Sequence, residues 1–279
     1  MKSKQKNKQD LLNPKNEYVF KCIFGHQGNE SITKSFISAV LNQNITYVVL
    51  ESDSTLPKDM LDDKVGILDV KVKIDNKINC DIEMQVVDKK NIEKRILFYC
   101  SKMYAHSITT GKDYLKLEKS IAILISNYEL ESLKEIKKYV SKWNLRGEDY
   151  GNIILTDGIE IYIIELLKFK KYMNNTALAD WVKFIINPKV IDMSNEEVKK
   201  AKTVLDELSQ DEHARRLAEL REKYIMDQKA TEAAGYDKGL EQGLKLGIKR
   251  TAKKLKSKGV DINIIRETTG LSIEEINKL

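Results

Sequence analysis

The sequence predicts an α/β protein of the α+β kind, in which helices flank a mixed central sheet and an all-helical extension follows at the C-terminal end. Residues 67–85 have the pattern of a β-hairpin, and residues 120–126 form a continuous apolar run typical of a strand buried on both faces. Residues 91–108 place apolar side chains at helical steps. After Pro188 the chain becomes highly charged and keeps helical spacing, which predicts the extension.

The composition is that of an ordinary globular protein and excludes several other classes. Of the 279 residues, 42% are hydrophobic and 32% are charged. The basic first residues lack the apolar segment of a signal peptide, and no apolar run approaches the length of about 18 residues that a membrane helix needs. The three cysteines form no metal-ligand or disulfide pattern, so we expect a cytoplasmic protein without membrane association. The net charge of +6 is compatible with a nucleic-acid partner.

The first part of the chain is expected to hold a tail, two helices and a strand. Residues 1–12 form a basic tail, which we expect to be flexible. Residues 17–24 have the apolar spacing of a helix that stops at Gly25, and residues 31–41 form a second amphipathic segment. Residues 45–51 are rich in β-branched and aromatic side chains, which indicates a strand.

The hairpin of residues 67–85 has one favourable register. With Asp75, Asn76 and Lys77 as the turn, one face becomes entirely apolar. Its pairs are Leu68 with Met84, Val70 with Ile82, Val72 with Cys80, and Ile74 with Ile78. The opposite face pairs Ile67 with Gln85, Asp69 with Glu83, Lys71 with Asp81, and Lys73 with Asn79. A shift by one residue would move charged side chains into the core, so the sequence determines this register.

Two further strands and a helix complete the predicted first domain, residues 13–190. Strands are expected at residues 153–155 and 160–166, joined by a turn at Asp157 and Gly158. Residues 177–186 then read as a helix that carries several large apolar side chains.

The predicted C-terminal region, residues 191–279, opens with a capping box made by Ser194 and Glu197. An apolar seam at coiled-coil spacing comes next, formed by Val198, Ala201, Leu205 and Leu208. Glycines then recur at every fourth position, as Gly235, Gly239, Gly243 and Gly247. Because each glycine costs a helix about 1 kcal/mol, two interpretations stand side by side: close approach of a second helix, or a weak, flexible helix.

A cluster of positive charge overlaps the end of this glycine pattern. Between Leu244 and Val260 there are basic residues and no acidic ones. We call this set the basic run: Lys245, Lys249, Arg250, Lys253, Lys254, Lys256 and Lys258. Such a block fits the binding of DNA phosphates, and a solvated helix face explains it equally well.

The last residues resemble a small helix-turn-helix. Gly259 ends the basic helix, residues 262–268 form a short helix that Gly270 ends, and a capping box at Ser272 starts the final one. The expected recognition helix carries Glu274 and Glu275, which DNA phosphates would repel. This favours a role in assembly over sequence-specific reading of bases.

The hairpin register has a chemical consequence at Asp69 and Glu83. Directly opposed residues on one face of an antiparallel pair have Cβ atoms about 5 Å apart, so two carboxylates would repel each other there. A hard divalent cation relieves this repulsion, because Mg²⁺ prefers carboxylate oxygens. The alternative is that Asp69 and Glu83 are ordinary side chains on a solvated hairpin face.

The order of several short motifs resembles the PD-(D/E)XK nuclease fold, with its restriction-endonuclease-like core. The nearest similarity is to the Rpn-type family of recombination-promoting nucleases, also described as PD-(D/E)XK family transposases. The resemblance rests on EYVFK at 17–21, ILDV at 67–70, IEMQ at 82–85, Arg95 with YCSKMY at 99–104, ELLKF at 165–169, WVKF at 181–184, the glycine-spaced helix and TGLS at 269–272. Each motif is weak alone, whereas their order is specific.

The resemblance implies metal-dependent hydrolysis of DNA. Asp69 and Glu83 would bind the cation, with the Met84 carbonyl as a third protein ligand. The expected ion is Mg²⁺, with Mn²⁺ or Ca²⁺ as alternatives, and no organic cofactor is implied.

Other positions depart from the consensus of the wider fold. Gln85 stands where that consensus has a lysine, and the Rpn-type pattern also has a glutamine at this place. A glutamine can orient a water molecule but carries no charge. Lys71 and Lys102 are candidates to supply the missing charge. Glu17, in place of an aspartate of the family's opening helix, would add a distal carboxylate.

The leading functional hypothesis is therefore an Mg²⁺-dependent deoxyribonuclease, an endonuclease linked to recombination or mobile elements, that works on DNA as a homodimer. The alternative is a catalytically weak or inactive DNA-binding or assembly protein on a nuclease scaffold. A coiled-coil adaptor is a third hypothesis, and it leaves the opposed carboxylates unexplained.

Overall fold

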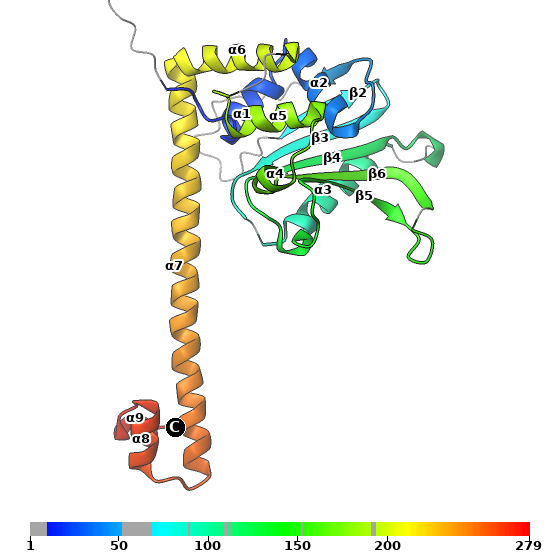
Figure 1. Ribbon diagram of the computed structural model, residues 1–279. Helices are drawn as coiled ribbons and strands as arrows, with labels where there is room; N and C mark the ends of the chain where they lie inside the picture. The colour runs from blue at the N-terminus through cyan, green and yellow to red at the C-terminus, as the bar shows by residue number, and fades with distance from the viewer. Residues whose placement is uncertain are drawn as a thin grey trace, which may run out of the picture. The chain divides into compact units, whose positions relative to one another are not determined.

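A computed structural model of the chain describes residues 10–51, 69–88, 90–108, 111, 113–151, 153–190 and 194–279. It divides into two compact units, Met1–Glu222 and Lys223–Leu279. Figure 1 shows a sheet with helices on both faces in the first unit and helices alone in the second. The predicted fold class, a mixed sheet with flanking helices and a helical C-terminal extension, is confirmed. Most of the predicted basic tail, residues 1–9, lies outside the described residues.

The sheet of the first unit has six described strands in the order β1-β2-β3-β4-β6-β5. Their bounds are Val48–Leu50 for β1, Val70–Ile74 for β2, Ile78–Gln85 for β3, Lys119–Ser126 for β4, Val140–Arg146 for β5 and Ile154–Glu165 for β6. Strands β3, β4 and β6 run parallel, and β1, β2 and β5 join the sheet in antiparallel pairs. The apolar run in β4 lies at the centre, buried on both faces as expected.

The hairpin of β2 and β3 has the predicted turn and register. Asp75 and Asn76 both have positive φ, the conformation of a tight hairpin turn that Asn and Asp tolerate. The observed pairs are Val70 with Ile82, Lys71 with Asp81, Val72 with Cys80, Lys73 with Asn79, and Ile74 with Ile78. Continuing this register by one residue places Asp69 opposite Glu83. The predicted pairs of Leu68 and Ile67 lie outside the described residues.

One face of the sheet is covered by the larger apolar core. Side chains of α1 (Glu17–Phe24), α2 (Glu30–Leu41) and α5 (Ala177–Ile186) pack there against the apolar side chains of β2, β3, β4 and β6. The face has Trp181 at its centre, fully buried among the rings of Phe24, Phe36 and Phe184. The short helix α4 (Leu166–Tyr172) leads from β6 into this layer.

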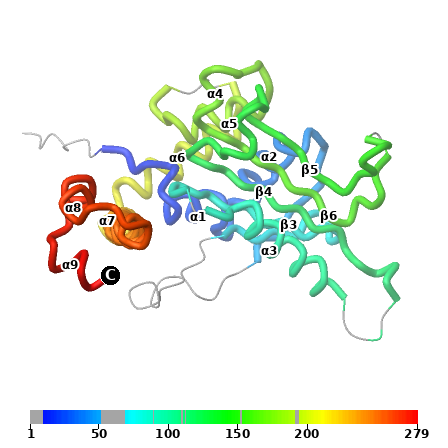
Figure 2. Tube along the Cα trace, turned by 90° about the horizontal axis from the view of Figure 1, so that it is seen from below, coloured from blue at the N-terminus to red at the C-terminus, as the bar shows by residue number. Residues whose placement is uncertain are grey.

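Among the described residues, the opposite face of the sheet is covered only in part. Helix α3 (Ile92–His106) lies against β3, β4 and β6, as Figure 2 shows, and buries Ile92, Ile96 and Cys100. The short helices η1 (Tyr114–Lys116) and η2 (Glu131–Leu133) come after it in sequence. On this side β2 presents Lys71, which is exposed, and Lys73, whereas β1 exposes Val49.

A buried ion pair holds the end of β6 to the segment around η2. Lys168 Nζ lies 2.7 Å from Glu165 Oε2, and both side chains are only 2% exposed. Lys168 also donates to the Leu133 carbonyl, and Glu165 Oε1 accepts from the Leu130 amide. Both charges are thus paired and hydrogen-bonded inside the protein.

Helix α6 (Glu196–Gln210) belongs to the first unit, because Val198, Ala201 and Leu205 pack into its core. The seam predicted from their spacing therefore contacts this core. The compact unit ends at Glu222, whereas the sequence-based division lies at residue 190. That division followed the change to a highly charged helical pattern after Pro188 and the capping box predicted at Ser194. The observed N-cap is Asn195, whose side chain accepts from the amides of Glu197 and Val198.

The prediction of two short strands joined at Asp157 and Gly158 is wrong. β6 runs through both residues, and its partner β5 was not predicted. Gly158 packs closely against α3: a Cβ there would lie 2.9 Å from the ring of Tyr104, so that ring would have to shift. The pairing of β5 with β6 is shifted on both sides of Leu145, and this irregularity removes the simple alternation that would have revealed β5.

The second unit contains most of α7 (Glu212–Ser257), followed by α8 (Ile262–Thr269) and α9 (Ile273–Asn277). Its small core forms around Ala252, Ile265 and Ile276. The predicted capping box at Ser272 is present, with Glu275 as its partner. Among the described helices, none combines the length and the apolar character needed to cross a membrane.

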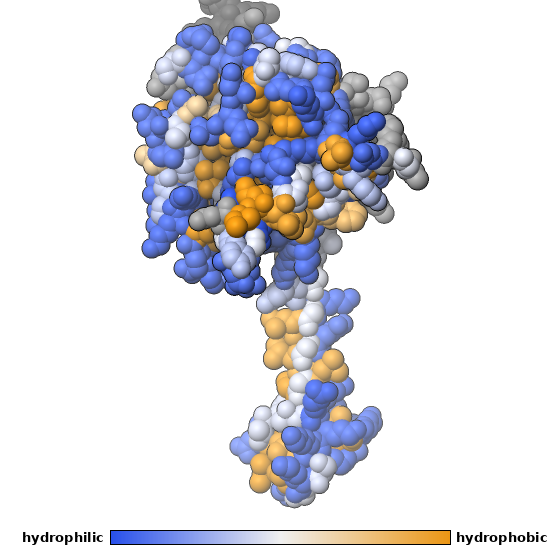
Figure 3. Space-filling view, turned by 90° about the vertical axis from the view of Figure 1, so that its right-hand side faces the viewer, coloured by the Kyte–Doolittle hydropathy of each residue, from blue (hydrophilic) through white to orange (hydrophobic). Residues whose placement is uncertain are grey.

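The glycine pattern lines a groove of about 600 Å³ on the second unit. Its walls are Gly239, Leu240, Gly243, Leu244, Gly247, Ile248, Thr251, Thr268 and Thr269. Leu240 and Leu244 are more than half exposed, and Figure 3 shows apolar side chains open to solvent along this helix.

Candidate active site

Three carboxylates gather on the partly covered face of the sheet. Alternation along the strands sends Val70 and Ile82 into the core, so Asp69 at the start of β2 and Asp81 and Glu83 on β3 face the other way. Asp69 and Glu83 each act electrostatically on Asp81, which shows that the three groups are neighbours.

Glu83 is bound by an arginine from the neighbouring helix. Arg95, in the first turn of α3, places Nη2 2.7 Å from Glu83 Oε1, a charge-assisted hydrogen bond. The Glu83 side chain is 13% exposed and that of Arg95 is 29% exposed, so solvent screens the pair only partly. The Arg95 guanidinium also lies 5.8 Å from the centre of the Tyr99 ring.

The pKa of Asp69 is raised to about 6, because burial disfavours its charged form. Arg95 is the strongest opposing influence and Lys71 the next, and both lower this pKa. Lys21 lowers it further, whereas the Glu17 carboxylate raises it. Asp69 is thus close to three cations, and its pKa is nevertheless raised.

Asp81 is a site residue that sequence reasoning did not assign. Burial raises its pKa well above the ordinary value, and the carboxylates of Asp69 and Glu83 raise it further. Its Oδ1 is buried and has no hydrogen-bond partner in the described part of the chain. One feature of the sequence could have identified Asp81, its position two residues before Glu83 on the same strand face. Because Asp81 also pairs with Lys71 across the hairpin, its charge was interpreted as the partner of that lysine.

Met84, whose carbonyl is the predicted third metal ligand, and Gln85, which is predicted to orient water, follow Glu83 on β3. The Gln85 carbonyl accepts from the Asn127 amide, 3.0 Å away, and so points toward β4. Because carbonyls alternate along a strand, that of Met84 points to the other side, where β2 begins at the Asp69 end. The Gln85 residue is 3% exposed and its Nε2 donates to the Val87 carbonyl at 3.3 Å.

The other predicted site residues, Lys71, Glu17 and Lys102, lie on three different elements. Lys71 is exposed and faces Asp81 in the register, without forming an ion pair with it in the described structure. Glu17 is buried at the start of α1, where Arg221 binds its Oε2 through Nε at 2.7 Å. Lys102 is exposed on α3, two turns or about 10 Å beyond Arg95, and it is not among the groups that shift the pKa of Asp69 or Asp81.

The basic run lies on the second unit, and each of its members is exposed. Lys245 pairs with Glu241 at 2.6 Å within the helix. Lys256 donates to the carbonyls of Ile276 and Asn277, which ties α7 to α9. The remaining five side chains therefore present most of the positive charge that this surface offers to solvent.

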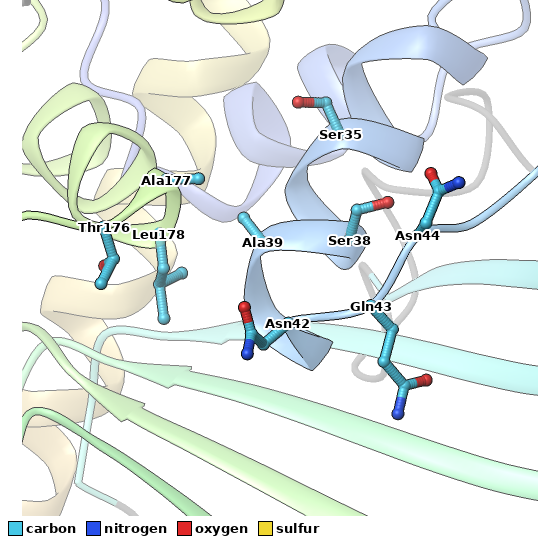
Figure 4. A pocket seen from close by; sticks show the side chains of 9 residues that line it. All are labelled: Ser35, Ser38, Ala39, Asn42, Gln43, Asn44, Thr176, Ala177 and Leu178. Carbon is cyan, nitrogen blue, oxygen red and sulfur yellow. The ribbon is translucent and has the colours of Figure 1, made fainter.

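A separate pocket of about 390 Å³ lies between the end of α2 and the start of α5. Figure 4 shows its lining, in which Ser35, Ser38, Asn42, Asn44 and Thr176 supply the short polar side chains. None of the lining residues is titratable, so this pocket offers no acid, base or metal ligand.

The carboxylate cluster fits a divalent cation by its chemistry. Among the described residues, no three His, Cys, Asp or Glu side chains are already arranged around a common point. The buried, unpartnered Asp81 oxygen and the repulsion within the cluster are nevertheless what an oxygen-binding cation would relieve. Asp69, Glu83 and the Met84 carbonyl supply hard oxygen ligands of the right kind.

Comparison with known proteins matches residues 14–234 to the family described as PD-(D/E)XK nuclease family transposase. The match covers the whole sheet, the carboxylate cluster and Arg95. We found no matching protein among curated proteins. No solved structure matches the chain either.

Proposed function

Because the chain belongs to the PD-(D/E)XK nuclease family transposases, we propose that it is an endonuclease that hydrolyses DNA phosphodiester bonds with a divalent cation. The observation that carries this proposal is the carboxylate cluster at the Asp69 end of the hairpin. The pKa values of Asp69 and Asp81 are raised in the folded protein, so both carboxylates cost stability when they are ionised. Functional sites are where proteins keep carboxylates of this kind.

Asp69, Glu83 and the Met84 carbonyl would hold the cation, with Mg²⁺ the expected ion. Such an ion polarises a phosphate and makes a bound water more acidic. Asp81 adds a third negative group beside these ligands and lies opposite Lys71. It would keep the Lys71 ammonium close to the site.

The surrounding residues have roles that depend on their charge. Lys71 is exposed and its ammonium lowers the pKa of both Asp69 and Asp81, so it lies where a phosphate oxygen could accept its hydrogen bond. Gln85 is the group that would orient water, through the amide oxygen that its bond to Val87 leaves available. Glu17 shapes the field at Asp69 from its pair with Arg221.

DNA is the proposed partner and a homodimer the proposed working form. The exposed members of the basic run would contact phosphates on both strands without reading bases. The glycine-lined groove on α7 would receive the same helix of a second copy, since small residues let two helices approach closely.

A second candidate is a DNA-binding or assembly protein with weak or no activity. The specific observation in its favour is Gln85, which is neutral and donates to the Val87 carbonyl where the wider fold has a charged lysine. In that case the cation site would bind metal and DNA without turnover.

Nicking of a supercoiled plasmid in Mg²⁺, Mn²⁺ or Ca²⁺ separates the two candidates. Wild type should nick DNA in at least one of the first two ions, and Asp69→Ala and Glu83→Ala should not. Glu135→Ala is the matched control, since this exposed carboxylate lies outside the cluster and should leave the rate unchanged. Metal binding without cleavage would favour the inactive scaffold, and equal rates for all variants would remove the carboxylates from the mechanism.

A further inference from the structure

Arg95 occupies one oxygen of the carboxylate that the proposed function needs. Its Nη2 lies 2.7 Å from Glu83 Oε1, the side chain expected to bind the cation. A guanidinium and a divalent cation cannot share one carboxylate oxygen without repulsion, because both are positive. Cation binding and the Arg95–Glu83 pair are therefore in competition.

The charge balance of the site changes when a cation arrives. The carboxylates of Asp69, Asp81 and Glu83 are formally balanced by the nearby cations Arg95, Lys71 and Lys21. A bound divalent ion upsets this balance and leaves an excess of positive charge. The excess is largest where Arg95 has lost its partner, and a phosphate group is the anion that the substrate brings there.

Arg95 is suited to that second partner. An arginine guanidinium is a planar fork of donors that matches two phosphate oxygens. The side chain is 29% exposed, so it can turn toward solvent without unfolding α3. The stacking contact with the exposed Tyr99 ring, 5.8 Å away, supports the guanidinium in its half-buried position.

We propose that Arg95 is an exchangeable counter-ion, which neutralises Glu83 in the metal-free protein and contacts a DNA phosphate once a divalent cation takes Glu83. This inference rests on the proposed function. It gives Arg95 the charge that the consensus lysine supplies elsewhere and that Gln85 lacks. It also separates Arg95 from Lys102, which lies on the same helix but too far from the carboxylates to compete with a cation.

Mn²⁺ binding in the absence of DNA tests the first half of the exchange. Arg95→Met keeps the apolar stem and removes the charge, so it should bind Mn²⁺ about tenfold more tightly than wild type, the effect of one lost charge-assisted hydrogen bond. Arg95→Lys should lie between the two. Lys102→Met is the matched control and should not change the affinity. Paramagnetic resonance titrations of free Mn²⁺ give these affinities directly, and circular dichroism checks that each variant is folded.

DNA binding in Ca²⁺ tests the second half, under conditions where cleavage is expected to be negligible. Arg95→Met should bind duplex DNA several-fold more weakly and lower the salt slope by about 0.9, the share of one phosphate contact. Its cleavage rate in Mg²⁺ should fall about 100-fold despite the tighter metal binding. If Arg95 had a purely structural role, Arg95→Met would instead weaken metal binding and cleavage together.

The outcomes distinguish this inference from the proposed function. If wild type binds Mn²⁺ through Asp69 and nicks DNA, but Arg95→Met binds Mn²⁺ no more tightly, Arg95 merely orients Glu83 and the exchange is overturned. Unchanged DNA affinity in Ca²⁺ would likewise overturn the phosphate contact. If wild type neither binds Mn²⁺ nor cuts DNA, the proposed function itself is refuted, and the exchange falls with it.

Discussion

Replacing Asp69 by asparagine should stabilise the metal-free protein while it abolishes activity. The pKa of Asp69 rises from 3.8 to about 6 on folding, chiefly because burial disfavours the carboxylate. One pKa unit corresponds to about 1.4 kcal/mol, so ionised Asp69 costs the folded state about 3 kcal/mol at neutral pH. Some of this cost is screened by water, which makes the expected gain for Asp69→Asn about 1 to 3 kcal/mol.

The sign of the pH dependence is set by the raised pKa. Below about pH 3.8 the carboxyl group is protonated in both states, and the substitution should have little effect on stability. As pH rises toward 6 the unfolded chain ionises first, so wild type loses stability relative to Asp69→Asn. The full difference should be present above about pH 6.5 and constant beyond it.

Urea unfolding in EDTA at about pH 4.5 and about pH 7.5 measures both quantities. Adding Mg²⁺ should raise the stability of wild type by about 2.7 kcal/mol when the ion is at about 100 times its dissociation constant, and it should leave Asp69→Asn unchanged. An asparagine variant that is less stable than wild type at the higher pH, or whose gain does not depend on pH, would refute the reasoning. Glu135→Gln, which removes an exposed carboxylate elsewhere, serves as the control.

Three further predictions concern the scaffold and the second unit. Lys168→Met should destabilise the protein by about 3 to 5 kcal/mol in urea unfolding, because it leaves the buried Glu165 carboxylate without its cation; a loss below about 1 kcal/mol would show that water reaches the pair. Gly158→Ala should cost about 1 to 3 kcal/mol, because the added methyl group lies 2.9 Å from the Tyr104 ring, and Tyr104→Leu in the same chain should recover most of it. Replacing members of the basic run by glutamine should lower the salt slope of DNA binding by about 0.9 for each phosphate contact removed, and an unchanged slope would exclude this surface from DNA binding.

The fold could be predicted where local pattern and burial agree. The hairpin register was predictable from the sequence, because only one pairing of residues 70–74 with 78–82 keeps charges out of the core. β4 was recognisable because parallel neighbours on both sides require an unbroken apolar run. β5 could not be recognised, since it is an edge strand with shifted pairing and mostly polar, exposed residues.

The site was predictable only within the hairpin. Asp69 and Glu83 are brought together by strand pairing alone, which the sequence encodes locally. Arg95 joins them through the packing of α3 on the sheet, and no spacing rule relates position 95 to position 83. Lys102 was a reasonable alternative on the same helix, but only the packing of Ile92, Ile96 and Cys100 determines which turn of α3 lies over the carboxylates.

The glutamine at position 85 has a physical explanation in this arrangement. Gln85 is 3% exposed, and its side-chain amide already donates to the Val87 carbonyl. A lysine at this position would therefore have to bury an ammonium group close to the Arg95–Glu83 pair. A neutral amide avoids that cost and keeps two hydrogen-bonding atoms. Under the proposed function, the positive charge would come from elements outside the motif, from Lys71 on β2 and from Arg95 on α3. A departure from a consensus motif can therefore preserve the charge of a site when tertiary packing supplies the missing group.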